Sequence, residues 1–218
     1  LTQGEYSMDR KAKTDASPLS WQIPVTAQLL GKDKLRTVIS GGKADLTLPG
    51  CGTLLINAGQ DGYYRTLYAP DQLAALKAHF GELTPKDQFG LVTDALALSQ
   101  AGYQPMAPAL DLLDAVSPAS SAKVQAELMG RWEALYGLIN DDSAAQAKLA
   151  GHVGDRFAPS LNRLGFAPKA DEPLLDNALR VQLITALGNM GDARVLAEGR
   201  RLFEALDRNP TAMDGPLR

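Results

Sequence analysis

Metal chemistry and nucleophilic chemistry have few candidate residues in this chain. It contains two histidines, His79 and His152, and a single cysteine, Cys51. Neither histidine belongs to an HExxH motif, which places two zinc ligands on one face of a helix. Cys51 is too isolated in the sequence to complete the tetrahedral ligand set of a zinc site. We therefore expect no metal ligands, and we interpret each histidine as a partly exposed helix residue.

Loops that grip phosphate and turns that present a nucleophile are also missing. The sequence has no GxSxG elbow, no P-loop and no dinucleotide-binding fingerprint. A glycine-bounded turn at residues 59–62 lies between two predicted strands, which favours a hairpin connection. One hypothesis for the function is an enzyme whose active site these motifs do not reveal. It predicts that the isolated chain has activity.

Carboxylates cluster in three pairs. The pairs are Asp111 with Asp114, Asp141 with Asp142, and Asp171 with Glu172. Negative charge at the start of a helix interacts favourably with the helix dipole, so helix-end stabilisation is favoured over acid-base catalysis. Asp94 differs, because apolar neighbours surround it from Val92 to Leu96. It is interpreted as a buried, hydrogen-bonded structural acid, with a role in a site as the alternative.

The cluster Tyr63-Tyr64-Arg65 combines two aromatic rings with a basic group. Its guanidinium can bind an anion, but packing of the rings with a tethered guanidinium is favoured. After these candidates, we assign no catalytic, cofactor-binding or metal-binding residue anywhere in the 218 residues.

Bulk composition excludes several classes of function. The 218 residues allow one large domain or two modest ones, and 45% hydrophobic with 22% charged residues is typical of a soluble globular protein. With a net charge of -3 and no dense block of Lys and Arg, the chain lacks the basic patch of a nucleic-acid-binding protein. No apolar run approaches the roughly 18–20 residues that cross a bilayer. One cysteine excludes an intrachain disulfide but leaves the compartment, cytoplasmic or exported, open.

The N-terminal part of the chain is predicted to be β-structure. Apolar and polar residues alternate from Trp21 to Leu29, which puts one face of a strand in a core. Pro24 cannot donate a ladder hydrogen bond, so it indicates a sheet edge or an unpaired position. The stretch 8–18 is predicted to be a charged, solvated loop, and further strands are predicted at residues 5–7, 35–39, 43–48, 54–56 and 63–68. Short strands with Gly and Pro turns indicate a small antiparallel β-sandwich over residues 1–68.

After residue 69 the apolar period lengthens to three or four, which predicts helices. Pro70 suits the first turn of one helix, and Thr84 followed by Pro85 predicts the start of the next. Five more amphipathic helices are predicted at residues 105–116, 120–140, 142–157, 173–189 and 191–206. Seven consecutive helices with short connections indicate an all-α, HEAT- or armadillo-like solenoid over residues 69–218. The predicted fold class is therefore α+β.

Five segments resemble, in order, motifs of the C-terminal half of the M1 family of zinc aminopeptidases. They are Leu1-Thr2-Gln3 with Tyr6, Trp21-Gln22-Ile23-Pro24-Val25, Ile56-Asn57-Ala58-Gly59 with Gly62-Tyr63-Tyr64-Arg65 and Tyr68, Leu91-Val92-Thr93-Asp94-Ala95, and Leu164-Gly165-Phe166 with Leu179-Arg180. The third segment is the most specific match, because it is similar to the family pattern "vNa…GyYRv.Y". Gln88 and Phe166 depart from the family, which commonly has Arg and Trp at these places.

The resemblance implies a β-sandwich followed by the first part of a superhelical C-terminal domain. The family's catalytic parts, a GxMEN motif, HExxH with a distant glutamate, and a tyrosine, are not carried over to any residue of this sequence. The resemblance thus implies a non-catalytic region of a zinc aminopeptidase, with the zinc in a catalytic domain elsewhere in the parent chain. This region would buttress that domain, and its helices would enclose the active-site chamber through which peptide substrates pass.

We also expect this chain to be a fragment of a longer protein. It begins with Leu1-Thr2 and no initiator Met, and Pro216-Leu217-Arg218 resembles a segment past which family members continue. A helical domain that stops early leaves its last helices without a stacking partner. We therefore expect an exposed apolar face near residues 195–206 that promotes self-association. The alternative function is a free-standing α-solenoid that binds a protein partner.

Overall fold

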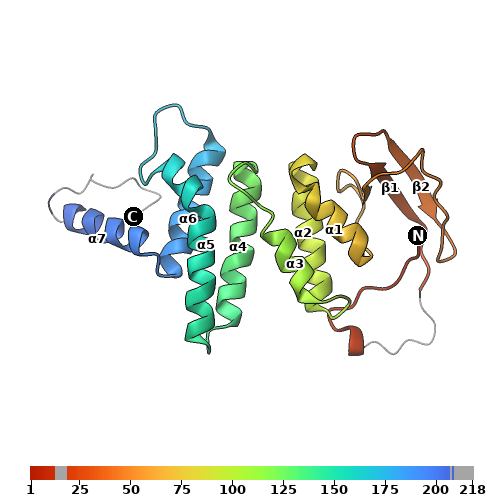
Figure 1. Cartoon of the computed structure of the whole chain (residues 1–218), viewed down its shortest axis with the longest axis horizontal. Coiled ribbons are helices and arrows are strands. Elements are labelled where there is room, and N and C mark those ends of the chain that lie inside the picture. The colour runs from red at the N-terminus through yellow and green to blue at the C-terminus, as the bar shows by residue number, and fades with distance from the viewer. Residues whose placement is uncertain (13–18, 207, 209–218) are drawn as a thin grey trace. The chain divides into compact units, whose positions relative to one another are not determined.

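The computed structural model describes residues 1–12, 19–206 and 208 (Figure 1). Within these ranges the strands are β1 (Ile23–Leu29), β2 (Lys34–Ile39) and β3 (Leu54–Ile56), and two 3-10 helices are η1 (Arg10–Ala12) and η2 (Phe80–Glu82). The α-helices are α1 (Pro70–Ala78), α2 (Pro85–Gln100), α3 (Met106–Leu113), α4 (Ala122–Leu138), α5 (Ser143–Leu164), α6 (Leu174–Asn189) and α7 (Ala193–Leu206). The predicted α+β class is confirmed. The chain divides into two compact units, Leu1–Ala115 and Val116–Arg218, which are described one at a time.

The sheet of the first unit is antiparallel, with the strand order β2-β1-β3. β1 pairs with β2 along most of its length, but with β3 only at Ala27, Gln28 and Leu29. The predicted alternation is confirmed, because Val25, Ala27 and Leu29 are buried. Pro24 lies beyond the residues that pair with β3, so β1 has no neighbouring strand on that side at this position. A proline, which has no backbone N–H to donate, is tolerated at such a place.

The predicted β-sandwich is wrong, because the described residues form a single sheet of three strands. Residues 5–7, 43–48 and 63–68, which were expected to be strands, are not strands of this structure. Lys43 makes only isolated bridges, to Thr2 and to Ser40. Alternation of apolar residues reports which side chains are buried, whereas a strand also needs a neighbour that completes its hydrogen-bond ladder. Residues 63–68 keep the alternating burial, but the amide of Thr66 donates to a side chain of α2 instead of a strand.

Proline and threonine set the helix starts of the first unit, as predicted. Pro70 lies in the first turn of α1, and Pro85 in that of α2. Thr84 caps α2, because its hydroxyl accepts a hydrogen bond from the amide of Asp87 at 3.3 Å. Gly102 follows the end of α2 with a φ of 82°, a conformation that favours glycine. The helices pack around a core whose buried members include Leu76, Val92, Ala109, Leu112 and Leu113.

In the second unit α6 packs against α4 and α5, and α7 packs on α6 (Figure 1). The predicted apolar stripe of α6 is confirmed at Leu179, Leu183 and Leu187, which have no exposed surface. Leu175, at the start of the same stripe, is half exposed. In α7, Val195 is the one buried residue among the described side chains. α7 is therefore held to its neighbours mainly through its first turn.

Several expectations about the organisation of the chain stay predictions. The start of α1 at Pro70 agrees with the expected change from β-structure to helices. The division into domains 1–68 and 69–218 stays a prediction, and so does the HEAT-like arrangement of the helices. Residues 13–18 of the predicted charged loop and the Pro216-Leu217-Arg218 segment lie outside the described residues. None of the helices in the described part of the chain is long and apolar enough to cross a membrane.

Candidate functional site

Asp94 joins helix α2 to the segment that follows the sheet. Its carboxylate accepts hydrogen bonds from Arg65 Nη1 and from the amide of Thr66, each at 3.0 Å. The prediction of a hydrogen-bonded acid is confirmed, although Asp94 is only partly buried, with 14% of its side chain exposed. Burial raises the pKa of Asp94, while the amide of Thr66 and the guanidinium of Arg65 lower it.

Arg65 also lies at the end of a stack of aromatic and basic side chains. Its guanidinium carbon is 5.0 Å from the ring centroid of Tyr6, and the rings of Tyr6 and Tyr103 stack at 5.8 Å. The guanidinium carbon of Arg10 lies 5.4 Å from the ring centroid of Tyr103. These contacts fasten the N-terminal segment to the region just after α2. No spacing rule in the sequence could have revealed them, since Tyr6 and Tyr103 lie far apart along the chain.

The cluster Tyr63-Tyr64-Arg65 does not act as one group. Tyr63 is fully exposed, whereas Tyr64 is half-buried, and this burial raises the pKa of the Tyr64 hydroxyl. The charge of Arg65 is already engaged by the carboxylate of Asp94. The arrangement thus favours the packing interpretation over an anion site.

The turn at residues 59–62 is anchored on the first turn of α2. The amide of Gly59 donates to Asp87 Oδ1 at 2.7 Å, and Asp87 Oδ2 accepts from the hydroxyl of Thr84 at 2.6 Å. Asn57 closes the turn: its side chain accepts from the amide of Gly62 at 2.8 Å and donates to the carbonyl of Gly62 at 3.0 Å. The predicted hairpin connection is wrong, because residues 63–68 form no strand after the turn. The amides of Gly59 and Gly62 are used inside the protein.

Tyr68 fixes the end of this segment against β3. Its hydroxyl accepts from the amide of Ile56 at 2.8 Å and donates to the carbonyl of Ile56 at 3.2 Å. Burial raises the pKa of the Tyr68 hydroxyl well above its ordinary value. The crevice that Tyr68 shares with Asp94 and Leu91 leaves no room for a ligand.

The histidines and the cysteine lie in separate surroundings. His79 is exposed at the end of α1, where its Nδ1 is 2.7 Å from a carboxylate oxygen of Glu82. His152 is also exposed, and its ring centroid lies 5.7 Å from that of Trp132. Cys51 is exposed. Within residues 1–12, 19–206 and 208, no three His, Cys, Asp or Glu side chains are grouped so that they could hold a metal ion.

Two of the clustered carboxylates, Asp142 and Glu172, act at a helix start and in an ion pair. Asp142 caps α5 by accepting from the amide of Ala145 at 2.9 Å, which confirms its helix-end role. Glu172 pairs with Arg180 of α6, and hydrogen bonding to this guanidinium lowers the pKa of Glu172. Arg180 is fully buried and also donates to Asn177 Oδ1 at 3.0 Å. The sequence marked Arg180 only as part of a segment that resembles the family, and nothing in the pattern indicated that it is buried.

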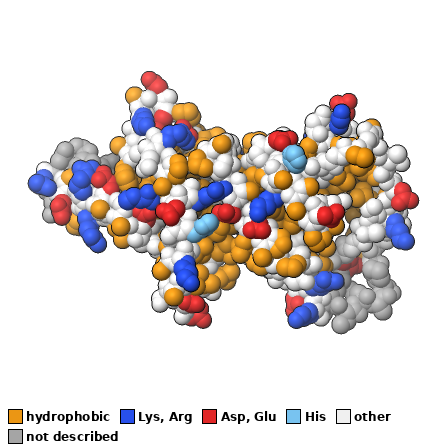
Figure 2. Space-filling model, viewed as in Figure 1, with side chains coloured by type: hydrophobic (Ala, Val, Ile, Leu, Met, Phe, Trp, Pro, Cys, Tyr) orange, Lys and Arg blue, Asp and Glu red, His pale blue; other side chains and the backbone are white. Residues whose placement is uncertain are grey.

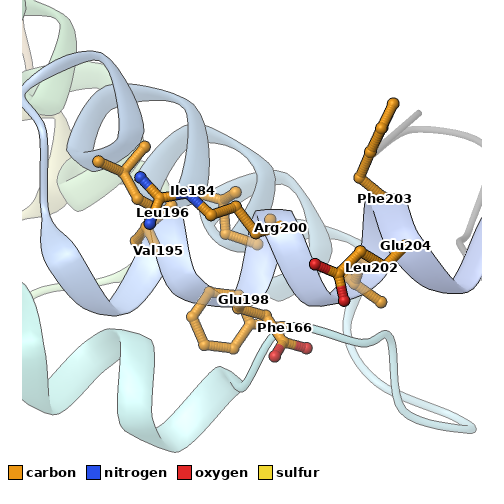
Figure 3. Close-up of a pocket in the computed structure, with 10 residues that line it drawn as sticks. Phe166, Ile184, Val195, Leu196, Glu198, Arg200, Leu202, Phe203 and Glu204 are labelled. Atoms are coloured by element: carbon orange, nitrogen blue, oxygen red, sulfur yellow. The ribbon is translucent and has the colours of Figure 1, made fainter.

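A groove of about 490 Å³ lies beside α7 in the second unit (Figure 3). Its apolar lining comes from Phe166, Ile184, Val195, Leu196, Leu202 and Phe203. The charged side chains at the groove are Glu198, Arg200 and Glu204. The expected apolar face near residues 195–206 is confirmed at Leu196, 39% exposed, and Phe203, 71% exposed. Elsewhere on the visible face of each unit, acidic and basic side chains are interspersed (Figure 2).

Comparison with protein families gives a match over most of the chain. The family model of the ERAP1-like C-terminal domain matches residues 53–218. This range begins just before β3 and includes the turn, the Asp94 contacts and all seven α-helices of the described structure.

Several curated aminopeptidases are similar to the chain. Aminopeptidase M1-D of Oryza sativa subsp. japonica is 31% identical over 162 residues, which cover 71% of this chain and 18% of that protein. Aminopeptidase M1 of Arabidopsis thaliana is 29% identical over 176 residues, covering 77% of this chain and 20% of that protein. Aminopeptidase A of Gloydius brevicauda is 26% identical over 227 residues, covering 94% and 23%. The chain thus spans about a fifth of the length of these relatives.

Proposed function

Because the chain belongs to the ERAP1-like C-terminal domain family and is a C-terminal region of the M1 aminopeptidase type, we propose that it is the non-catalytic part of a zinc-dependent aminopeptidase. The observation that carries this proposal is the family match over residues 53–218. In this proposal zinc and the catalytic groups belong to another domain of the parent chain. That domain hydrolyses N-terminal peptide bonds with a metal-activated water.

The use of the polar side chains in the first unit supports a non-catalytic role. Asp94 is satisfied by Arg65 and Thr66, and Asp87 by Gly59 and Thr84. A general base must lie within hydrogen-bonding distance of a substrate proton, which requires a cavity beside it. The crevice at Asp94 has no such space. These carboxylates therefore hold the segment that follows β3 against α2.

A buttressing role is supported by the hydrogen bonds that hold the segment after the turn in place and by the outer surface of that segment. The segment after the turn is fastened inward by Thr66 and Tyr68, whereas Tyr63 and Leu67 face solvent, with Leu67 51% exposed. A rigid segment that presents an aromatic and an aliphatic side chain is suited to pack against another domain. We propose that the catalytic domain of the parent covers Tyr63 and Leu67.

The helices of the second unit are proposed to form part of a wall around the active-site chamber. α4, α5 and α6 lie side by side, and their contacting faces are apolar (Figure 1). Consecutive helices that pack on their neighbours along the chain are the building principle of a solenoid. Such a wall would admit short or unfolded peptides to the catalytic domain.

The proposal is tested first on the purified chain 1–218. We expect no stoichiometric zinc by atomic emission and no turnover of aminoacyl anilides, with an M1 aminopeptidase as the positive control. Bound zinc or turnover by the isolated chain would refute the non-catalytic assignment.

A second test asks for the size of the protein in its own cells. An antibody against the chain should detect a polypeptide of roughly 100 kDa, since 23.2 kDa covers about a fifth of the relatives. The reading frame upstream of Leu1 should encode HExxH. A product of only 23 kDa, with an initiator Met just before Leu1, would instead support the free-standing interaction module.

A further inference from the structure

The first residues of the chain pair with the segment that follows β2. The amine of Leu1 donates to the carbonyl of Ala44 at 2.8 Å, and the amide of Ala44 donates to the carbonyl of Leu1 at 3.0 Å. The neighbouring residues Thr2 and Lys43 lie opposite each other as an antiparallel bridge. Pairs that exchange two hydrogen bonds alternate in this way with pairs that exchange none along an antiparallel ladder. The ladder is thus in register up to Leu1.

Residues 45–48 continue this segment without a partner strand. Half-buried Leu46 and Leu48 alternate with exposed Asp45 and Thr47, as in a strand with one face toward a core. Within the described part of the chain, the N–H groups of Leu46 and Leu48 have no backbone acceptor. Every second residue of a strand directs its N–H to the same neighbour, so both groups point to the side on which Ala44 meets its partner. An edge that is open in this way accepts an extended segment.

The register of the existing pair indicates which segment fits this edge. Partners in an antiparallel ladder run in opposite directions, so residues 45, 46, 47 and 48 face the first, second, third and fourth residues before Leu1 in a longer chain. Leu46 then exchanges two hydrogen bonds with the second of these residues, and the amide of Leu48 donates to the fourth. The carbonyl of Leu48 already accepts from the amide of Gly50 at 2.9 Å, so the ladder ends there.

We propose that the four residues of the parent chain directly before Leu1 form an antiparallel strand with residues 45–48. This inference rests on the proposed function, in which the catalytic domain belongs to the same parent chain. Opposite residues of a ladder share a face, so the second and fourth of these residues are apolar and pack beside Leu46 and Leu48. The chain that comes from the catalytic domain therefore enters this unit as a strand fixed by backbone hydrogen bonds, and not as a flexible linker.

Hydrogen exchange followed by mass spectrometry, with fragmentation that resolves single amides, compares the parent protein with chain 1–218. In the parent the amides of Leu46 and Leu48 should exchange about tenfold more slowly, because each gains a hydrogen bond. The amides of Asp45 and Thr47 point to the other edge and should change little. Equal protection of all four amides, or of none, would overturn the proposal. Protection of Leu46 in chain 1–218 that rises with concentration would also overturn it, because a second copy would then take this edge.

Proline substitution in the parent protein adds a matched pair of variants. Leu46→Pro removes an N–H that donates to the new strand, whereas Asp45→Pro removes one on the other edge. Leu46→Pro should return the exchange of the Leu48 amide to its rate in chain 1–218, and Asp45→Pro should leave this amide protected. The same effect from both variants would overturn the proposal.

The outcomes separate this inference from the proposed function. A reading frame that begins at Leu1 would overturn both. An upstream frame that encodes HExxH, together with unchanged exchange at Leu46 and Leu48, would overturn the added strand alone.

Discussion

Replacement of Asp87 tests how firmly the turn at residues 59–62 is held on helix α2. This buried carboxylate lies in the first turn of α2 and is 2% exposed. One oxygen accepts from the amide of Gly59 at 2.7 Å, and the other accepts from the hydroxyl of Thr84 at 2.6 Å. In Asp87→Ala both donors lose their partner, and the amide of Gly59 stays partly buried without one.

The expected cost follows from these two bonds. A hydrogen bond to a charged acceptor contributes about 1.5–3 kcal/mol, and loss of support for the Thr84 cap adds about 1 kcal/mol. Asp87→Ala should therefore lower the free energy of opening of the junction by about 3 kcal/mol. Asp87→Asn is the matched control, because its oxygen still accepts from Gly59 while its NH₂ group donates to the hydroxyl of Thr84. The charge is lost and the hydroxyl proton of Thr84 loses its acceptor, but both contacts keep a hydrogen bond, so a smaller cost of about 1 kcal/mol is expected.

Amide hydrogen exchange measured by NMR gives the free energy of local opening at Gly59 itself. It does not assume that the two units unfold together. In Asp87→Ala the protection of the Gly59 amide should fall roughly a hundredfold, as a change of about 3 kcal/mol requires. In Asp87→Asn the fall should be about fivefold. If the Gly59 amide is similarly protected in the unsubstituted chain, in Asp87→Ala and in Asp87→Asn, the reasoning is refuted, because the turn is then held by other contacts.

Three further changes probe the same junction by urea unfolding. Gly62→Ala should cost about 2 kcal/mol, because its Cβ would lie 2.2 Å from Tyr64 Cε1, whereas Gly81→Ala, with no neighbour within 4 Å, should cost much less; equal costs would contradict the close packing. Asn57 has a φ of 59°, so Asn57→Ala should be about 1 kcal/mol less stable than Asn57→Gly, and the opposite order would exclude strain as the cause. Burial raises the pKa of Tyr68 above 10.0, so the unfolded chain releases this proton first as the pH rises. The stability that the Tyr68 hydroxyl provides is therefore complete below pH 10.0 and is lost above it, and the advantage over Tyr68→Phe, about 1–2 kcal/mol at neutral pH, should narrow there; a constant difference would contradict the raised pKa.

The helix starts were predictable because their signals are local. Thr84 and Pro85 specify a cap and a first turn within a few residues, and the structure has both. The stripe of α6 was predictable for the same reason, since leucines four apart lie on one side of a helix. Each of these features depends on residues less than two turns away.

The sheet was predictable only in part. The pattern from Trp21 to Leu29 identified β1, but residues 63–68 have a similar pattern and form no strand. Both stretches alternate in burial, and only one has neighbours that complete its backbone hydrogen bonds. Pairing partners come from distant parts of the chain, so alternation alone overestimated the number of strands.

The sequence by itself determined the helices, the central strand and the resemblance that identified the family, because these depend on residue types at short, regular spacings. The tertiary structure decided what the conspicuous side chains do. Arg65 lies between Asp94 and the ring of Tyr6, and Asp87 holds the amide of Gly59. These partners are about 28–60 residues apart in the chain, and a hydrogen bond or ring contact over that separation exists only after the chain has folded.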